Sequence, residues 1–165
     1  MRNTVFVRAL SFITIIVALT AQGLAQPSAH QLGGTINDYT AALDPSGPWH
    51  ITGVWSLKLS GGSGKGDFIA ALNMVRADNP VRAAHTHDVS LLDADVVPLA
   101  NGFRLIGGAV LTSNGNLAGF TGSTVDIQAT GGSAVQFSNV AVTFGGASTA
   151  HFGDQPLHGV VTDQR

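Results

Sequence analysis

The sequence predicts one all-β domain, an antiparallel meander of seven or eight strands that closes into a small β-barrel, with a two-layer β-sandwich as the alternative. Apolar and polar residues alternate over short runs, and the chain's 21 glycines, with Asn, Asp and Ser, separate these runs. Beyond the N-terminal segment, no stretch of a dozen residues has helical periodicity. The connections are mostly local, and closing such a meander protects its edges, so the barrel is favoured.

The first 25 residues have the three parts of a secretory signal peptide. Arg2 and Arg8 form a basic start, an apolar run follows from Ala9 to Ala21, and small residues at Gly23-Leu24-Ala25 predict cleavage after Ala25. The run is shorter than the ~20 residues that span a bilayer, so no membrane span is expected after cleavage. We therefore expect an exported protein, periplasmic or secreted.

Residues 26–48 are expected to form an irregular N-terminal arm, with at most an edge strand over Thr35 to Leu43, because turn-forming residues recur in it. Residues 49–165 are expected to form the barrel or sandwich. In this part, Trp55, Leu57 and Leu59 share one face of a strand. The turn Gly61-Gly62-Ser63-Gly64 then leads to a strand with Phe68, Ala70, Leu72 and Met74 on one face, which predicts a hairpin.

The next strand, Ala84 to Leu92, carries two histidines on one face with Val89 and Leu91. A loop with Asp93, Asp95 and Pro98 is expected after it, and Gly107-Gly108 predicts a break in the following strand. Further features are expected along the rest of the chain: a hairpin turn at Ser113-Asn114-Gly115-Asn116, a strand over Val125 to Ala129, a tight turn at Thr130-Gly131-Gly132-Ser133, a strand over Val135 to Phe144 with a β-bulge at Ser138-Asn139, and a last strand over Pro156 to Thr162.

Composition narrows the function classes. After signal cleavage, six scattered basic residues face ten aspartates, a net charge near −4, which argues against a nucleic-acid partner. The chain has no cysteine, so thiol chemistry and disulfides are excluded, and it has no glutamate, so any carboxylate role must fall to aspartate. The Gly-rich, weakly charged strands leave a homo-oligomer open.

The most informative residues are His85 and His87. At positions i and i+2 on a strand they project from the same face, close enough for both imidazoles to bind one metal ion, zinc for example. A complete site needs further ligands. The candidates are His151, His158, His50, Asp88 and Asp126. Without a metal, the pair would only hydrogen-bond with each other, the backbone or solvent.

Ala84-His85-Thr86-His87 and the closing Gln155-Pro156-Leu157-His158-Gly159-Val160-Val161, together with the Leu59 to Met74 hairpin, resemble the chordin-type (CHRD) extracellular domain. The resemblance implies an immunoglobulin-like sandwich with a non-catalytic binding function.

Two functional hypotheses follow. The first is an exported, non-catalytic domain that binds a small ligand or a metal ion, with His85, His87, His151, His158 and Asp88 as ligand-binding candidates and the first three as metal ligands. The second is a metal-dependent hydrolase or isomerase that uses the same histidines, with an aspartate as base and catalytic residues otherwise unknown. A metal-dependent enzyme requires the C-terminal histidines to converge on the His85/His87 pair around one ion, whereas binding or structural roles do not.

Overall fold

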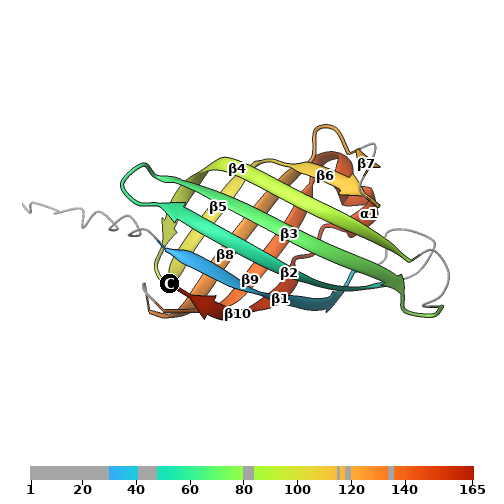
Figure 1. The fold of residues 1–165 in the computed structure, drawn as a ribbon, viewed down its shortest axis with the longest axis horizontal. Helices are drawn as coiled ribbons and strands as arrows, with labels where there is room; N and C mark the ends of the chain where they lie inside the picture. Colours follow the sequence, from blue (N-terminus) through green and yellow to red (C-terminus); the bar gives the residue numbers. More distant parts are fainter. Residues whose placement is uncertain (1–29, 41–47, 80–83, 115, 118–119, 134–135) are drawn as a thin grey trace, which may run out of the picture.

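A computed structural model of the chain describes residues 30–40, 48–79, 84–114, 116–117, 120–133 and 136–165 (Figure 1). The elements in order are β1 (Gln31–Tyr39), β2 (Trp49–Ser60), β3 (Lys65–Arg76), β4 (His85–Leu99), β5 (Gly102–Gly108), β6 (Val110–Ser113), β7 (Asn116–Leu117), β8 (Thr124–Ser133), β9 (Gln136–Gly145), the 3-10 turn η1 (Gly146–Ser148), α1 (Thr149–Phe152) and β10 (Leu157–Gln164).

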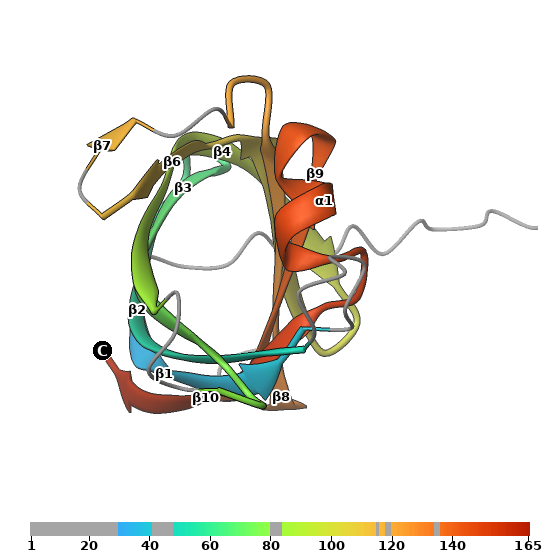
Figure 2. The ribbon, with the colours of Figure 1, turned by 90° about the vertical axis from the view of Figure 1, so that its right-hand side faces the viewer.

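The strands form a closed antiparallel barrel, as predicted, and not the alternative sandwich. β1 to β5 and β8 to β10 each pair with the next strand in this order, and β10 pairs back with β1. Figure 2 faces one end of the barrel and shows these strands as a ring, with α1 at the rim beside β9. The short strand β6 continues along β4 beyond the end of β5 and forms a hairpin with β7. The architecture therefore follows from local connections plus one closing seam.

Several local predictions are confirmed. β2 and β3 form the expected hairpin, in which Phe68, Ala70, Leu72 and Met74 face the core. The break at Gly107-Gly108 separates β5 from β6, and Asn114 has the positive φ expected of the hairpin turn that follows. Thr130 pairs with Asn139 and Gly131 with Phe137, so Ser138 is the extra residue of the expected bulge. Val135 lies outside the described residues.

The N-terminal segment differs from the expectation of an irregular arm with at most an edge strand. β1 runs from Gln31 to Tyr39 and pairs on both sides, with β2 and with β10. Its alternate residues Leu32, Gly34 and Ile36 are buried, so β1 is one of the strands that form the barrel wall. The glycine pair Gly33-Gly34 suggested irregular structure. At Gly34 the reason for a glycine is instead close packing, because an added Cβ there would lie 1.9 Å from the carbonyl oxygen of Val160.

The expected loop after the histidine strand is instead a bulge within one long strand. β4 continues to Leu99, with Asp95 paired to both β3 and β5. Asp93 has a φ of 54°, and its backbone N–H donates to Oδ1 of Asp67 at 2.8 Å. The carboxylate of Asp67 thus stabilises the bulge that the sequence suggested as a turn. The strand β8 likewise continues through Thr130-Gly131-Gly132-Ser133, where we expected a tight turn.

The interior of the barrel is filled by apolar side chains that alternate along every strand, with Phe68, Phe103 and Phe144 among the largest. At one end, α1 packs onto this core through Phe152, whose ring stacks on Phe144 with centroids 4.0 Å apart. Among the described residues, no helix is long and apolar enough to cross a membrane. Buried polar side chains, among them His87 and Ser148, lie at this end of the core near α1.

Candidate metal centre

Strand β4 brings two histidines into this end of the barrel. His85 pairs with Met74 and His87 with Leu72 on β3, and both histidines share the inward face with Val89. His87 is only 1% exposed, and His85 at the strand's start is partly buried. The period-2 geometry of a strand therefore places both imidazoles on the core side. The sequence pattern predicted that the histidines share a face with Val89 and Leu91, and the structure turns that face inward.

The third histidine comes from α1, 64 residues later. Phe152 anchors this single helical turn against Phe144, and Gly153 ends it with a φ of 86°. On the side before the helix, Ser148 Oγ donates to the carbonyl of Gly145. These contacts fix the turn at the rim, and they hold His151 over the strand that carries the other two histidines.

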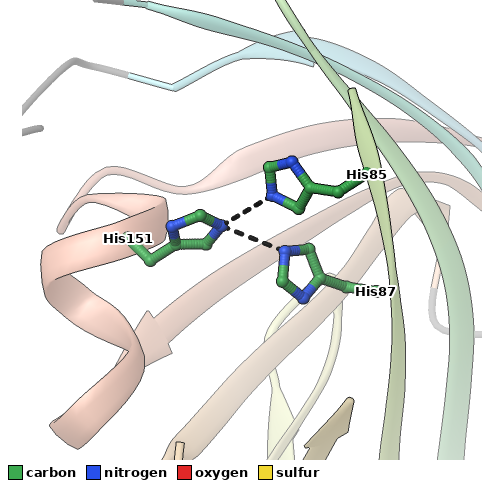
Figure 3. Close-up of side chains that lie close together, drawn as sticks. All are labelled: His85, His87 and His151. Carbon is green, nitrogen blue, oxygen red and sulfur yellow. Dashed lines mark hydrogen bonds between the residues drawn. The ribbon is translucent and has the colours of Figure 1, made fainter. Parts of the chain in front are cut away.

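The three rings converge through their Nε2 atoms (Figure 3). Nε2 of His151 lies 3.1 Å from Nε2 of His85 and 3.0 Å from Nε2 of His87. One ring nitrogen of each histidine lies within 4.8 Å of the others. Nitrogen ligands at ~2.0–2.1 Å from a tetrahedral zinc ion would be about 3.3 Å apart, so the two separations from His151 are close to those of a metal site.

The hydrogen bond of His87 to the backbone fixes which of its nitrogens carries the proton. Nδ1 of His87 lies 2.8 Å from the carbonyl oxygen of Thr112 on β6. A carbonyl can only accept, so Nδ1 donates, and Nε2 of the neutral ring bears a lone pair that faces the cluster. Metal-binding histidines are oriented in the same way by a second hydrogen bond.

The environment of His87 keeps its ring neutral. Burial lowers the pKa of His87 from 6.5 to about 4 as the largest cause, and the nearby His151 and His85 lower it further. The hydrogen bond to Thr112 and the charge of Asp88 act in the opposite direction and are outweighed. Near pH 7 His87 therefore offers an unprotonated Nε2, which is the form that binds a metal.

The cluster has too few protons to satisfy both contacts of His151. If Nε2 of His151 carries a proton, it makes one linear hydrogen bond, to His85 or to His87. If it carries a lone pair, His87 cannot donate to it, because the only proton of neutral His87 is on Nδ1. At most one of the two contacts is then a good N–H···N bond. A cation that accepts all three lone pairs resolves this shortage.

Aromatic side chains surround the three imidazoles. The ring of Trp49 packs edge to face with His85 at 5.0 Å, and that of Phe120 lies 5.6 Å from His87 and 5.5 Å from His151. Phe152 contacts His87 and His151 at 5.0 and 5.1 Å. These rings give the imidazoles largely apolar neighbours, which would strengthen their electrostatic interaction with a bound ion.

The other candidates from the sequence lie apart from this group. His158 is mostly exposed, and its Nδ1 lies 3.0 Å from Oδ2 of Asp38. Asp88 projects from the outer face of β4, where the hydroxyl of Thr112 donates to Oδ2 at 3.3 Å. Among the described His, Asp, Glu and Cys residues, only His85, His87 and His151 form such a group. A ligand-binding role for His158 and Asp88 stays a prediction.

His50 and Asp126, the remaining candidates for the third or fourth ligand, have other partners. Nε2 of His50 lies 2.6 Å from Oδ1 of Asn37, and its ring stacks on Tyr39. Asp126 accepts two hydrogen bonds from the guanidinium of Arg104, at 2.8 and 2.5 Å. Their side chains stabilise pairs of neighbouring strands instead of extending the histidine cluster.

Sequence reasoning missed the residues that support the cluster. Thr112, Phe120 and Phe152 have no spacing that links them to His85 or His87. Their positions depend on the pairing of β6 with β4 and on the packing of α1. A long-range register of this kind has no signal in a single sequence. Phe152 directly follows His151 in the sequence, but this adjacency does not by itself indicate that Phe152 packs onto the core and holds His151 in place.

Comparison with known protein families, with curated proteins and with solved structures finds no match. The resemblance to the chordin-type domain is therefore untested by any comparison. The assignment of this site depends on its own geometry and chemistry.

The depressed pKa of His87 predicts a pH-dependent stability in metal-free protein. Between pH 6.5 and about 4 the unfolded chain binds a proton that folded His87 does not, so the free energy of unfolding falls as the pH falls through this window. Above pH 6.5, the free energy of unfolding is about 3 kcal/mol larger than below pH 4 on account of this group. We expect urea unfolding in EDTA to show this loss, and the variant His87→Gln to lack it. Equal pH profiles for the two proteins would contradict the assignment.

Proposed function

We propose that this protein is an exported domain that binds a divalent transition metal ion, with zinc as the first candidate, through His85, His87 and His151. The observation that carries the proposal is the convergence of three Nε2 atoms, with too few protons for both short contacts of His151 to be good hydrogen bonds. Three imidazoles suit zinc and other late first-row metals, and they do not suit magnesium or calcium, which prefer oxygen ligands.

The proposed role is binding and not catalysis. A hydrolase or isomerase needs a general base near the metal-bound water or substrate, and with no glutamate in the chain that base would be an aspartate or a histidine. Among the described residues, no carboxylate joins the cluster, and Asp88, Asp38 and Asp126 are each engaged elsewhere. A metal-dependent hydrolase remains the second candidate, because three histidines leave a coordination position open, as catalytic zinc sites do.

Zinc is expected to stabilise the folded protein and magnesium is not. A ligand that binds only the folded state adds RT ln(1 + [L]/Kd), about 2.7 kcal/mol at 100 times the Kd. The test is thermal unfolding of the mature protein, without a His tag, in EDTA, in zinc and in magnesium. The variant His158→Ala, whose histidine lies outside the cluster, should keep the zinc effect. An unfolding temperature that zinc leaves unchanged would overturn the proposal.

A further inference from the structure

Among the described residues, no carboxylate at the cluster offsets the charge of the proposed metal ion. A divalent ion held by three neutral imidazoles keeps its full charge of +2. The described carboxylates do not reduce it directly: the cluster contains none of them, and Asp88 lies on the outer face of β4. The walls formed by Trp49, Phe120 and Phe152 cannot solvate the charge as water would. Charge in such surroundings is costly unless a counter-charge lies close by.

A buried donor next to the cluster also lacks a partner. The indole Nε1–H of Trp49 is buried and makes no hydrogen bond, although its residue is only 4% exposed. The Trp49 ring lies 5.0 Å from that of His85 and 6.3 Å from that of His151. Buried indole N–H groups usually find an acceptor, and an indole can donate but not accept. Because the Trp49 ring lies beside the cluster, a ligand bound there would bring the acceptor that this N–H lacks.

From these two observations, and given the metal site proposed above, we propose that the open coordination position binds a small aliphatic carboxylate with the indole N–H of Trp49 as its second contact. One carboxylate oxygen binds the metal ion and reduces the net charge to +1. The other oxygen accepts the hydrogen bond from Trp49. The short aliphatic part meets the rings of Phe120 and Phe152, which limit its size and favour an apolar group.

The chain offers a matched control for Trp49. Trp55 lies on the same face of β2, is also 4% exposed, and also has a buried Nε1–H without a partner. It packs against Phe68 in the middle of the barrel, about 20 Å along the strand from Trp49. Replacing either tryptophan by phenylalanine removes one N–H and keeps an aromatic ring. Only the change at Trp49 should affect a ligand at the metal.

The experiment uses the mature protein loaded with cobalt(II), whose visible absorption responds to its coordination. Appearance of the cobalt spectrum tests the metal site itself. Titration with acetate then tests the inference, and acetamide, which has nearly the same shape without the charge, is the control. We expect acetate to change the spectrum saturably and acetamide not to. The variant Trp49→Phe should weaken acetate binding at least ~10-fold, since hydrogen bonds to charged groups are the stronger ones, and Trp55→Phe should leave it unchanged.

The outcomes separate the two proposals. A cobalt spectrum that does not respond to acetate overturns the carboxylate ligand and leaves the metal site intact. An acetate response that Trp49→Phe leaves unchanged overturns the role of the indole. If no cobalt spectrum forms, the metal site fails and the inference fails with it. Should Trp49→Phe not fold, the contrast between acetate and acetamide on the wild-type protein still decides whether the position takes a carboxylate.

Discussion

The variant His151→Ala is expected to bind zinc at least ~100-fold more weakly than the wild-type protein. Loss of a residue that only supports a metal ligand already costs ~10–100-fold in affinity, and His151 is proposed as a ligand itself. Its Nε2 lies 3.0 to 3.1 Å from both other histidines, so its loss leaves two ligands on one strand. The measurement is a competition titration against a chromophoric chelator at pH 7.5, where His87 is neutral.

The stability of the metal-free protein should change little in this variant, because His151 is only partly buried and the neighbouring Phe152 keeps α1 anchored to the core. His158→Ala is the matched control, since His158 is seven residues further along the chain and lies on the surface with Asp38. Zinc affinity that falls equally in both variants, or in neither, would contradict the assignment of His151.

The variant Gly34→Ala is expected to destabilise the fold by about 3 kcal/mol or more. Gly34 lies in β1, between β2 and the closing strand β10, and an added Cβ would be 1.9 Å from the carbonyl oxygen of Val160 and 2.9 Å from the ring of Trp55. The first of these contacts is with backbone, which cannot rotate away, so the seam of the barrel must separate. Overpacking in a core costs ~1–3 kcal/mol even where side chains can adjust. Urea unfolding measures the change.

Gly108→Ala is the control for this prediction. Gly108 ends β5, and an added Cβ there would meet no atom within 4 Å. Alanine at a compatible glycine position stabilises by ~0.4–1 kcal/mol because it restricts the unfolded chain. The two alanine variants are therefore expected to change the free energy of unfolding in opposite directions. Equal, small effects would indicate that β1 and β10 do not close the barrel as described.

Much of the barrel could be predicted because its determinants are local. The apolar residues Phe68, Ala70, Leu72 and Met74 at alternate positions indicated which face of β3 is buried, and the change of parity at Ser138-Asn139 indicated the bulge. These features depend only on the period of a strand and on turn chemistry. Local connections also explain the order of most of the eight strands, once β1 is counted as a strand, whereas the pairing of β1 with β10 closes the barrel between the two ends of the domain.

The sequence did not indicate that β1 pairs on both sides, because its glycines predicted irregular structure. Gly33 and Gly34 are typical of loops, and the close approach of Val160 and Trp55 explains why the strand needs a residue without a side chain at Gly34. Likewise, Asp93 and Asp95 predicted a loop. In the structure the backbone N–H of Asp93 donates to the carboxylate of Asp67 on the neighbouring strand and stabilises a bulge. Both cases depend on contacts between strands that a single sequence does not specify.

The candidate site was predictable in part. Two histidines at i and i+2 on an apolar strand face indicated a cluster, because strand geometry puts them on one side. Which C-terminal histidine joins them depends on η1 and α1, a short helical segment that the sequence pattern did not indicate. His151 and His158 were both candidates from the sequence, with His151 expected as the metal ligand, and the structure brings only His151 to the cluster.

The most direct test of the central claim is the metal content of the mature protein, purified without a His tag and without chelators, measured by elemental mass spectrometry beside the variant His85→Ala/His87→Ala. The proposed site predicts close to one zinc or similar transition-metal ion per chain after incubation with the metal and removal of excess, and none in the folded variant. A wild-type protein that retains no metal, or a variant that retains as much as the wild type, would contradict the proposed three-histidine site.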